Sequence, residues 1–246
     1  MGEFSGKRVL VTGSTRGIGR ATAELIAAHG GDVIWHGRRA DEAKRAASGG
    51  AFVSGDLADR LACRRIAAEA GEIDVLVNCA GVLHEVPIAE TSEAIWDRTI
   101  AVNLTAAWIF ARALLETLRR RRGVVVNVAS DSAILGYVNS AAYAASKGAM
   151  VGLTKALAVE LAPDVRAIVV CPGPVATDMM RDSNATSADS AAAAAAWVNP
   201  TMLRRPARPK EIAEVIAFAA SARASYMTGD VVMVDAGVTA GRRVGL

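Results

Sequence analysis

The chain has 246 residues, of which 52% are hydrophobic and 22% charged, and its mean hydropathy is +0.27. This composition excludes a disordered chain and suits one compact α/β domain over residues 1–246, with no need of disulfides or metals to stabilise its core. A formal net charge of only +3 argues against a nucleic-acid partner. The one dense basic run, LRRRRG at 118–123, is typical of a helix C-terminus, where cations are favoured by the helix dipole.

Three cysteines lack the C-x-x-C spacing of metal or redox sites and cannot all pair, which favours the reducing cytoplasm. The N-terminus has no apolar run of signal-peptide length, and Gly6 stands where myristoylation requires Ser or Thr. No segment approaches the roughly 18 apolar residues of a membrane span. We therefore expect no membrane association. His29, His36 and His84 lack metal-ligand spacing, so we also expect no metal site.

Short, almost wholly apolar runs alternate with amphipathic segments along the chain. Strands are predicted at 7–13, 32–37, 51–56, 74–81, 123–130, 165–173 and 230–237. Helices are predicted at 17–29, 58–70, 101–120, 142–161 and 209–221. Strands that are apolar on both faces are covered on both sides, so the pattern predicts a three-layer, doubly wound Rossmann fold with a mostly parallel seven-stranded sheet.

One long segment, 174–208, has no strand signal and is rich in Asn, Ser, Asp and Pro. Connections of this length are usually functional or disordered. The alanine run at 191–196 favours a short helix within it. We expect a mobile lid over the substrate, with a plain surface insertion as the alternative.

The sequence TGSTRGIG at 12–19 follows the first predicted strand and enters a helix. Glycines at this place let the backbone approach a pyrophosphate, whose charge the helix N-terminus stabilises. The chain has no Gly-Lys-Ser/Thr after these glycines and no Gly-x-Ser-x-Gly, which argues against a P-loop and an α/β hydrolase. A dinucleotide site is therefore predicted here.

The second predicted strand bears on the choice of dinucleotide. An NAD site has an acidic residue about 20 positions after the glycines, whereas this strand ends in Gly37 followed by Arg38 and Arg39, with Arg16 inside the glycine loop. Guanidinium groups suit a 2′-phosphate, so NADP(H) is predicted over NAD(H). The alternative is that Arg38 and Arg39 merely pair with the acidic residues at 41 and 42.

Tyr143 and Lys147 lie four residues apart, on one face of the helix predicted at 142–161. A free tyrosine has a pKa of about 10 and exchanges protons slowly at neutral pH. A neighbouring ammonium would lower that pKa and make the phenol a usable acid and base. Because one Tyr-x-x-x-Lys often occurs by chance, an exposed helix pair is the alternative.

Over nearly its whole length the sequence resembles the short-chain dehydrogenase/reductase family, through TGSTRGIG, GDLAD, NCAG, NLTAAW, ASDSA, YAASK, CPGPVATDM and SYMTGDVVMVDAG in this order. The resemblance implies four catalytic residues. Ser130 would bond the substrate oxygen, Tyr143 would exchange the proton, Lys147 would hold the nicotinamide ribose, and Asn103 would support a water-linked proton path. Ser132 is the alternative to Ser130.

The glycine and arginine arguments, together with the resemblance, give a set of residues for the cofactor. They are Gly13, Thr15, Arg16, Gly17, Ile18, Gly19, Arg38, Asp56, Leu57, Asn78, Ala80, Gly81, Tyr143, Lys147, Pro172, Gly173, Val175 and Thr177. The chain departs from the family at Cys79 and Ile168, where asparagine is frequent, and neither change removes a catalytic group. His84 could border the substrate pocket.

These features predict an NADP(H)-dependent oxidoreductase that transfers a hydride between nicotinamide and a small secondary alcohol or ketone. A narrower alternative is reduction of a 3-oxoacyl thioester on a carrier protein or coenzyme A. For it, Arg204, Arg205, Arg208 and Lys210 would suit an acidic carrier, or would simply be a solvated face. A non-catalytic NADP(H)-sensing protein is the alternative from another class. The resemblance implies a homodimer or homotetramer built on the two long helices and the last strand.

Overall fold

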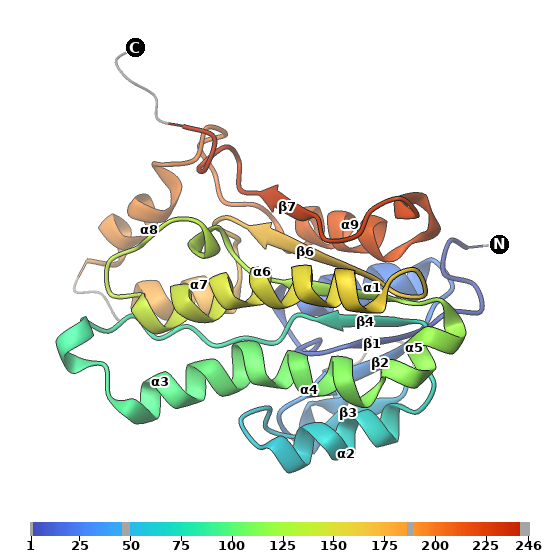
Figure 1. The fold of residues 1–246 in the computed structure, drawn as a ribbon. Coiled ribbons are helices and arrows are strands. Elements are labelled where there is room, and N and C mark those ends of the chain that lie inside the picture. Colours follow the sequence, from blue (N-terminus) through green and yellow to red (C-terminus); the bar gives the residue numbers. More distant parts are fainter. Residues whose placement is uncertain (1, 46–49, 186–188, 242–246) are drawn as a thin grey trace.

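The computed structural model describes residues 2–45, 50–185 and 189–241. Its centre is one sheet in the order β3-β2-β1-β4-β5-β6-β7, with every neighbouring pair parallel (Figure 1). The strands are β1 Arg8–Val11, β2 Asp32–Gly37, β3 Phe52–Ser54, β4 Val75–Asn78, β5 Val124–Val128, β6 Arg166–Pro172 and β7 Val231–Val234. The seven predicted strands and the doubly wound fold are confirmed.

The described α-helices are α1 Gly17–Ala28, α2 Arg60–Ala70, α3 Glu93–Ile100, α4 Ala106–Ala113, α5 Leu115–Arg121, α6 Ala141–Leu161, α7 Asp178–Ala185, α8 Ser190–Val198 and α9 Pro209–Ala220. Short 3₁₀ turns are η1 Ala40–Arg45, η3 Ile88–Glu90, η5 Asp131–Ala133 and η6 Ala222–Ala224, and η4 Ala101–Thr105 is a π-helical segment. The helices predicted at 17–29, 58–70, 142–161 and 209–221 are confirmed within two residues at each end.

Two helical layers cover the sheet. Alternate residues of β1 enter opposite cores: Val9 and Val11 pack with Ile26 of α1 and Ile216 of α9, whereas Leu10 packs on the face of α2, α4 and α6. Figure 1 shows α4 and α6 on the near face of the sheet, with α1 behind it. Burial on both faces explains why the strands are almost wholly apolar. The strand order reverses between β1 and β4, where such sheets bind ligands at their carboxyl edge.

The helix predicted at 101–120 differs from the structure at both ends. It begins earlier, at α3, because the Ser92 hydroxyl caps that helix by accepting from the Ile95 N–H. It then widens into η4 and bends by 60° at Leu114 before α5. No single helix in the described ranges is long and apolar enough to cross a membrane; the bent pair Glu93–Ala113 and Leu115–Arg121 reaches that length and composition only together.

The basic run at 118–123 forms the last turn of α5. Arg120 and Arg121 both form ion pairs with Glu72, at 2.8 and 3.1 Å, and Arg119 lies 3.7 Å from Glu116. Cations at this position also favour the negative end of the helix dipole. Three of these arginines are therefore partnered within the chain, as expected for a helix terminus.

The segment 174–208 contains two helices where the sequence predicts one. α8 includes the alanine run at 191–196, and the Asp189 carboxylate caps it by accepting from the Ala191 and Ala192 N–H groups. α7 precedes it and lacks the alanine signal, since it contains Asp, Arg, Ser and Asn. Residues 186–188, between the two, lie outside the described ranges.

Candidate active site

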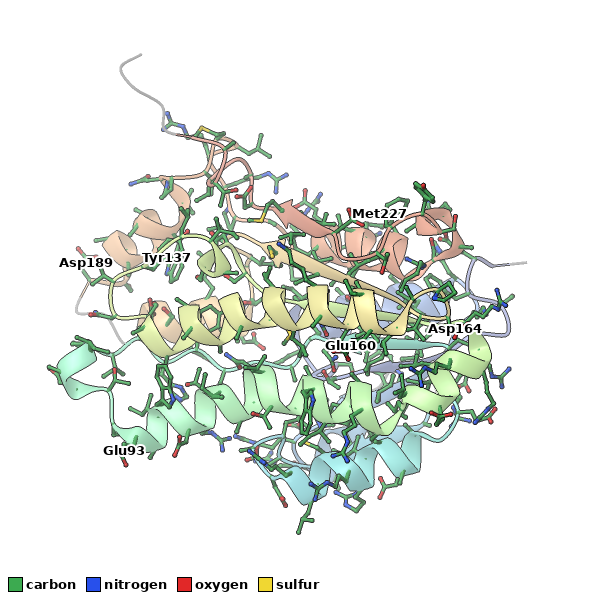
Figure 2. All side chains as sticks on the ribbon, viewed as in Figure 1. Glu93, Tyr137, Glu160, Asp164, Asp189 and Met227 are labelled. Atoms are coloured by element: carbon green, nitrogen blue, oxygen red, sulfur yellow. The ribbon has the colours of Figure 1, made fainter. Side chains whose placement is uncertain are left out.

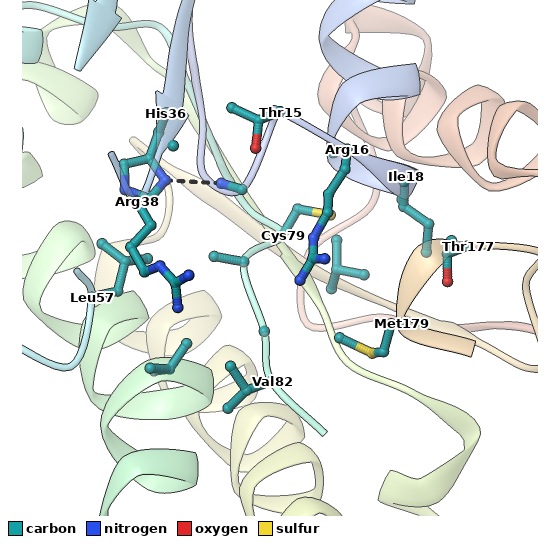
Figure 3. Close-up of a pocket in the computed structure, with 18 of the residues that line it drawn as sticks. Thr15, Arg16, Ile18, His36, Arg38, Leu57, Cys79, Val82, Thr177 and Met179 are labelled. Carbon is teal, nitrogen blue, oxygen red and sulfur yellow. Dashed lines mark hydrogen bonds between the residues drawn. The ribbon is translucent and has the colours of Figure 1, made fainter. Parts of the chain in front are cut away.

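A cavity of about 300 Å³ lies at the carboxyl edge of the sheet and extends from the glycine loop to α6 (Figure 3). It collects most of the predicted cofactor residues: Gly13, Thr15, Arg16, Gly17, Ile18, Gly19, Arg38, Asp56, Leu57, Ala80, Gly81, Tyr143, Lys147 and Thr177. Residues that lie far apart in the sequence, before α1 and on α6, thus share one cavity.

The glycine loop has the conformation that close approach of a ligand requires. Gly13 has φ of 67°, and a Cβ there would lie 2.8 Å from the Ala80 Cα, so only glycine fits. Arg16 precedes α1 without a side-chain capping bond. Within the described ranges no side-chain cap accepts from the first turn of α1, which lies beside the cavity, and free N–H groups at a helix start can bind a phosphate. These residues fit the pyrophosphate of a dinucleotide.

His36, at the end of β2, supports this loop. Its Nδ1 accepts a 3.0 Å hydrogen bond from the Gly13 N–H (Figure 3). Its Nε2 lies 3.1 Å from the Gly55 carbonyl oxygen. The ring therefore carries its proton on Nε2. Burial lowers the pKa of His36, against the opposing effects of the Gly55 hydrogen bond and the charges of Glu42 and Asp56. The sequence did not predict this role, because His36 was considered only as a metal ligand and the contact depends on Gly13 and Gly55 lying beside it.

The arginines after β2 differ in their surroundings. Arg39 forms a bidentate ion pair with Asp41, at 3.0 and 2.9 Å, as the alternative interpretation expects. Arg38 does not follow that interpretation: its backbone N–H, not its guanidinium, bonds Glu42. In the described part of the chain no carboxylate forms an ion pair with the Arg38 guanidinium, which points into the cavity (Figure 3).

At the chemical end, α6 holds Tyr143 and Lys147 one turn apart. The Lys147 ammonium donates a 2.9 Å hydrogen bond to the Val128 carbonyl oxygen and lies 5.6 Å from the centroid of the Tyr143 ring. Lys147 is 4% exposed, and this burial lowers its pKa to about 8. The pair faces the cavity together, so it is not an exposed helix pair.

The expected lowering of the Tyr143 pKa is wrong. Burial raises that pKa to about 12, although the Ser130 hydroxyl opposes the rise as a hydrogen-bond partner; the charge of Asp131 adds to it. Desolvation is the largest cause of this rise. Tyr143 is therefore protonated at neutral pH and can donate a proton.

Ser130 has a carboxylate partner that the sequence did not predict. Its hydroxyl donates a 2.9 Å hydrogen bond to Asp131 Oδ1, and the Tyr137 hydroxyl donates one of 2.7 Å to Asp131 Oδ2. Asp131 is 4% exposed, and burial raises its pKa. Ser132, the alternative to Ser130, donates its N–H to the Ser130 hydroxyl. Asp131 therefore orients the serine that is expected to meet the substrate oxygen.

Asn103 lies in the π-helical segment η4, and its amide is fully used. Its Oδ1 accepts from the Val82 N–H at 2.8 Å, while its Nδ2 donates to the Val82 carbonyl oxygen and the Ser146 hydroxyl, both at 3.0 Å. A Cβ on Gly81 would lie 3.4 Å from Asn103 Oδ1 and 3.6 Å from Lys147 Nζ. Asn103 thus ties the loop after β4 to α6 beside Lys147.

Six predicted residues do not line this cavity: Asn78, Asn103, Ser130, Pro172, Gly173 and Val175. The Asn78 amide donates to Asn127 in the neighbouring strand instead, at 2.8 Å. Val175 pairs with Ala207 in an isolated bridge, and a Cβ on Gly173 would lie 2.8 Å from the Asp235 Cα. Asn78, Gly173 and Val175 therefore contact the ends of neighbouring strands and loops and do not line the cavity.

A second cavity, of about 490 Å³, lies under the segment 174–208. Tyr137 lines it together with Trp197 of α8, and their rings are in tilted contact with centroids 6.0 Å apart and an interplanar angle of 39°; Figure 2 shows Tyr137 beside α8. Glu85, after β4, accepts a hydrogen bond from Ser183 of α7 at the same cavity. Through Tyr137 and Asp131 this cavity connects to Ser130.

The remaining candidates play smaller parts. His84 lines neither cavity, and its Nδ1 lies 3.2 Å from the Thr99 hydroxyl. Cys79 lines the first cavity with its pKa raised to about 12 by burial, and Ile168 is buried in β6. The described residues contain no group of three or more His, Cys, Asp or Glu that could hold a metal ion.

Comparison with known proteins agrees with this geometry. Residues 13–239 match a family model described as enoyl-(acyl carrier protein) reductase. Cyclopentanol dehydrogenase of Comamonas is 35% identical, over 98% of this chain and 100% of its own length. The 3-oxoacyl-(acyl-carrier-protein) reductase FabG of Escherichia coli is 34% identical, over 96% and 98%.

Among solved structures, a putative NAD(P)-dependent gluconate 5-dehydrogenase from Beutenbergia cavernae, with NADP bound at low occupancy, superposes with a TM-score of 0.88. It is 37% identical, and the match covers 98% of this chain and 100% of that chain. The chain belongs to the short-chain dehydrogenase/reductase family. It is an oxidoreductase that acts on alcohol or ketone groups of small molecules with a nicotinamide cofactor.

Proposed function

We propose that this protein reduces a small ketone, or oxidises the corresponding secondary alcohol, with NADP(H). One observation carries the proposal: the glycine loop, Arg38, Tyr143 and Lys147 line a single cavity at the carboxyl edge of the sheet. A dinucleotide bound along this cavity would have its phosphates at the α1 N-terminus. Bound there, the cofactor supplies the hydride.

The chain's own residues supply the proton and the positioning. Tyr143, protonated at neutral pH because its pKa is raised to about 12, donates a proton to the carbonyl oxygen as that oxygen gains charge. Ser130, oriented by Asp131, holds the same oxygen. Lys147, fixed by the Val128 carbonyl, binds the ribose and places a positive charge near the phenol. Ser130, Asn103, Tyr143 and Lys147 are therefore the proposed catalytic residues.

The proposed preference for NADP(H) depends on Arg38 and Arg16. Arg38 has no competing ion pair in the described ranges, whereas Arg16 lies 3.8 Å from Asp182 of α7, with both side chains more than half exposed. Such an exposed pair is weak and can yield to a phosphate. The NADP in the Beutenbergia relative supports the same choice. NADH binding more tightly than NADPH would contradict it.

A second candidate is reduction of a 3-oxoacyl thioester, favoured by the 34% identity to the Escherichia coli reductase. The basic residues expected to bind an acidic carrier are less available than the sequence suggests. Arg205 forms a bidentate ion pair with Glu211, at 2.8 and 2.7 Å, and Arg208 lies 3.5 Å from the same carboxylate. The small-ketone assignment is therefore preferred.

The test follows NADPH consumption with cyclopentanone, simple sugars, a steroid ketone and a 3-oxoacyl thioester as separate substrates. NADPH consumption with any of the first three substrates, and none with the thioester, supports the proposal. NADPH consumption with the thioester alone favours the second candidate. A protein that binds NADPH but consumes it with none of them would agree with the non-catalytic alternative.

We also propose that 174–208 acts as a substrate lid, because its helices cover the second cavity.

A cytoplasmic homodimer or homotetramer is proposed from the family resemblance. The 41% exposed Trp108 of α4, the 81% exposed Val159 of α6 and the edge position of β7 support such an assembly. Sedimentation velocity tests it, and a monomer at micromolar concentration would contradict it.

A further inference from the structure

The end of β2 has an acidic group that the linear sequence conceals. Gly37 ends β2 at the position where an NAD site has an acidic residue. A Cβ built on Gly37 would lie 2.4 Å from Glu42 Oε2. Glu42 belongs to η1, which folds back on the strand, so its carboxylate fills the volume that a side chain at position 37 would need.

The Glu42 carboxylate is held in place and still has an acceptor to offer. Its Oε2 accepts a 2.9 Å hydrogen bond from the Arg38 N–H. No donor in the described part of the chain bonds its Oε1. Glu42 is half-buried and lines the first cavity together with Arg38, Asp56 and Leu57. A carboxylate acceptor therefore borders the adenosine end of the proposed cofactor site.

We infer that Glu42 selects between the two nicotinamide dinucleotides, and that this site binds both NADH and NADPH. A carboxylate at this end of the sheet accepts hydrogen bonds from the ribose hydroxyls of NADH. The same negative charge repels a 2′-phosphate, which the Arg38 guanidinium attracts. Arg38 and Glu42 thus act in opposite directions on one ribose, and Glu42 limits the preference for NADPH.

This inference rests on the proposed cofactor site and adds a residue to it. A purely structural role for Glu42, as a cap for the Arg38 N–H, would predict no change in selectivity. Glu42→Gln separates the two roles, because glutamine keeps the size and one oxygen to accept from that N–H while it loses the charge.

The experiment measures the dissociation constants of NADH and NADPH by isothermal titration for the parent, Glu42→Gln, Arg38→Gln and Asp41→Asn. Asp41→Asn is the matched control, since it removes the same charge one residue away and outside the cavity. In Glu42→Gln we expect NADPH to bind about tenfold tighter and NADH about tenfold weaker. Arg38→Gln should weaken NADPH and leave NADH nearly unchanged.

The outcomes separate the two claims. If Glu42→Gln changes both dissociation constants by the same factor, or changes their ratio no more than Asp41→Asn does, the role of Glu42 is wrong. If Arg38→Gln leaves NADPH binding intact, the proposed NADP(H) preference fails, whatever Glu42 does. Glu42→Ala provides a second variant, and equal thermal midpoints for all proteins show that binding, not folding, has changed.

Discussion

The ammonium of Lys147 lies 5.6 Å from the centroid of the Tyr143 ring, one turn away on the same helix. Burial shifts the pKa of both groups: it lowers that of Lys147 to about 8 and raises that of Tyr143 to about 12. Tyr143 is therefore a proton donor at neutral pH, and Lys147 is the member of the pair whose charge titrates near physiological pH.

This titration predicts that NADPH binding weakens as pH rises. Lys147 is protonated below a pKa of about 8 and loses its charge above it, so the dissociation constant of NADPH should rise about threefold to tenfold between pH 7 and 9.5. Fluorescence titration across this range measures it. Lys147→Met should bind more weakly at pH 7 and show a nearly flat profile; a flat profile in the parent contradicts the assignment.

The contact between His36 and Gly13 predicts a loss of stability in mild acid. The pKa of His36 is lowered below 6.5 in the folded protein, so the unfolded chain binds more protons as pH falls, and the free energy of unfolding decreases below about pH 6.5. Urea unfolding at pH 7.5 and 5.5 measures this. His36→Asn should remove this part of the pH dependence, whereas the control His29→Asn, at a partly exposed histidine, should retain it.

The buried carboxyl of Asp131 predicts that the free energy of unfolding decreases as pH rises. Its pKa is raised by burial, so its contribution to stability is present at low pH and is lost as pH rises through the folded pKa. Asp131→Asn has no such dependence, and its free energy of unfolding relative to the parent should therefore increase from pH 4.5 to 7. Tyr137→Phe removes a hydrogen bond that lowers the pKa of Asp131. The free energy of unfolding of this variant should therefore fall more between pH 4.5 and 7 than that of the parent. A constant difference between parent and Asp131→Asn would contradict a raised pKa.

Local patterns predicted much of this molecule. The apolar runs predicted the strands because both faces of a parallel sheet are buried, and the spacing of Tyr143 and Lys147 placed them together because α6 is one continuous helix. The glycine loop was predictable because Gly13 must have a positive φ directly after β1.

What was missed depends on contacts between distant segments. Glu42 reaches Gly37 only because η1 folds back, and Asp131 gains its partner only because the loop before α6 brings Tyr137 to it. Likewise, no local pattern announces the bend at Leu114, and the polar sequence of α7 hides its helix. The pKa of Tyr143 was misjudged because the spacing shows the ammonium but not the burial, and burial dominates.

The most direct measurement is the rate of ketone reduction by Tyr143→Phe, with the fully exposed Tyr226→Phe as its control. Removal of one hydroxyl should lower kcat by about 10²-fold to 10⁴-fold, while NADPH binding stays within about threefold of the parent, because the proton donor is lost and the cofactor cavity is not. Tyr226→Phe should match the parent. A Tyr143→Phe variant that turns over as fast as the parent would contradict the account.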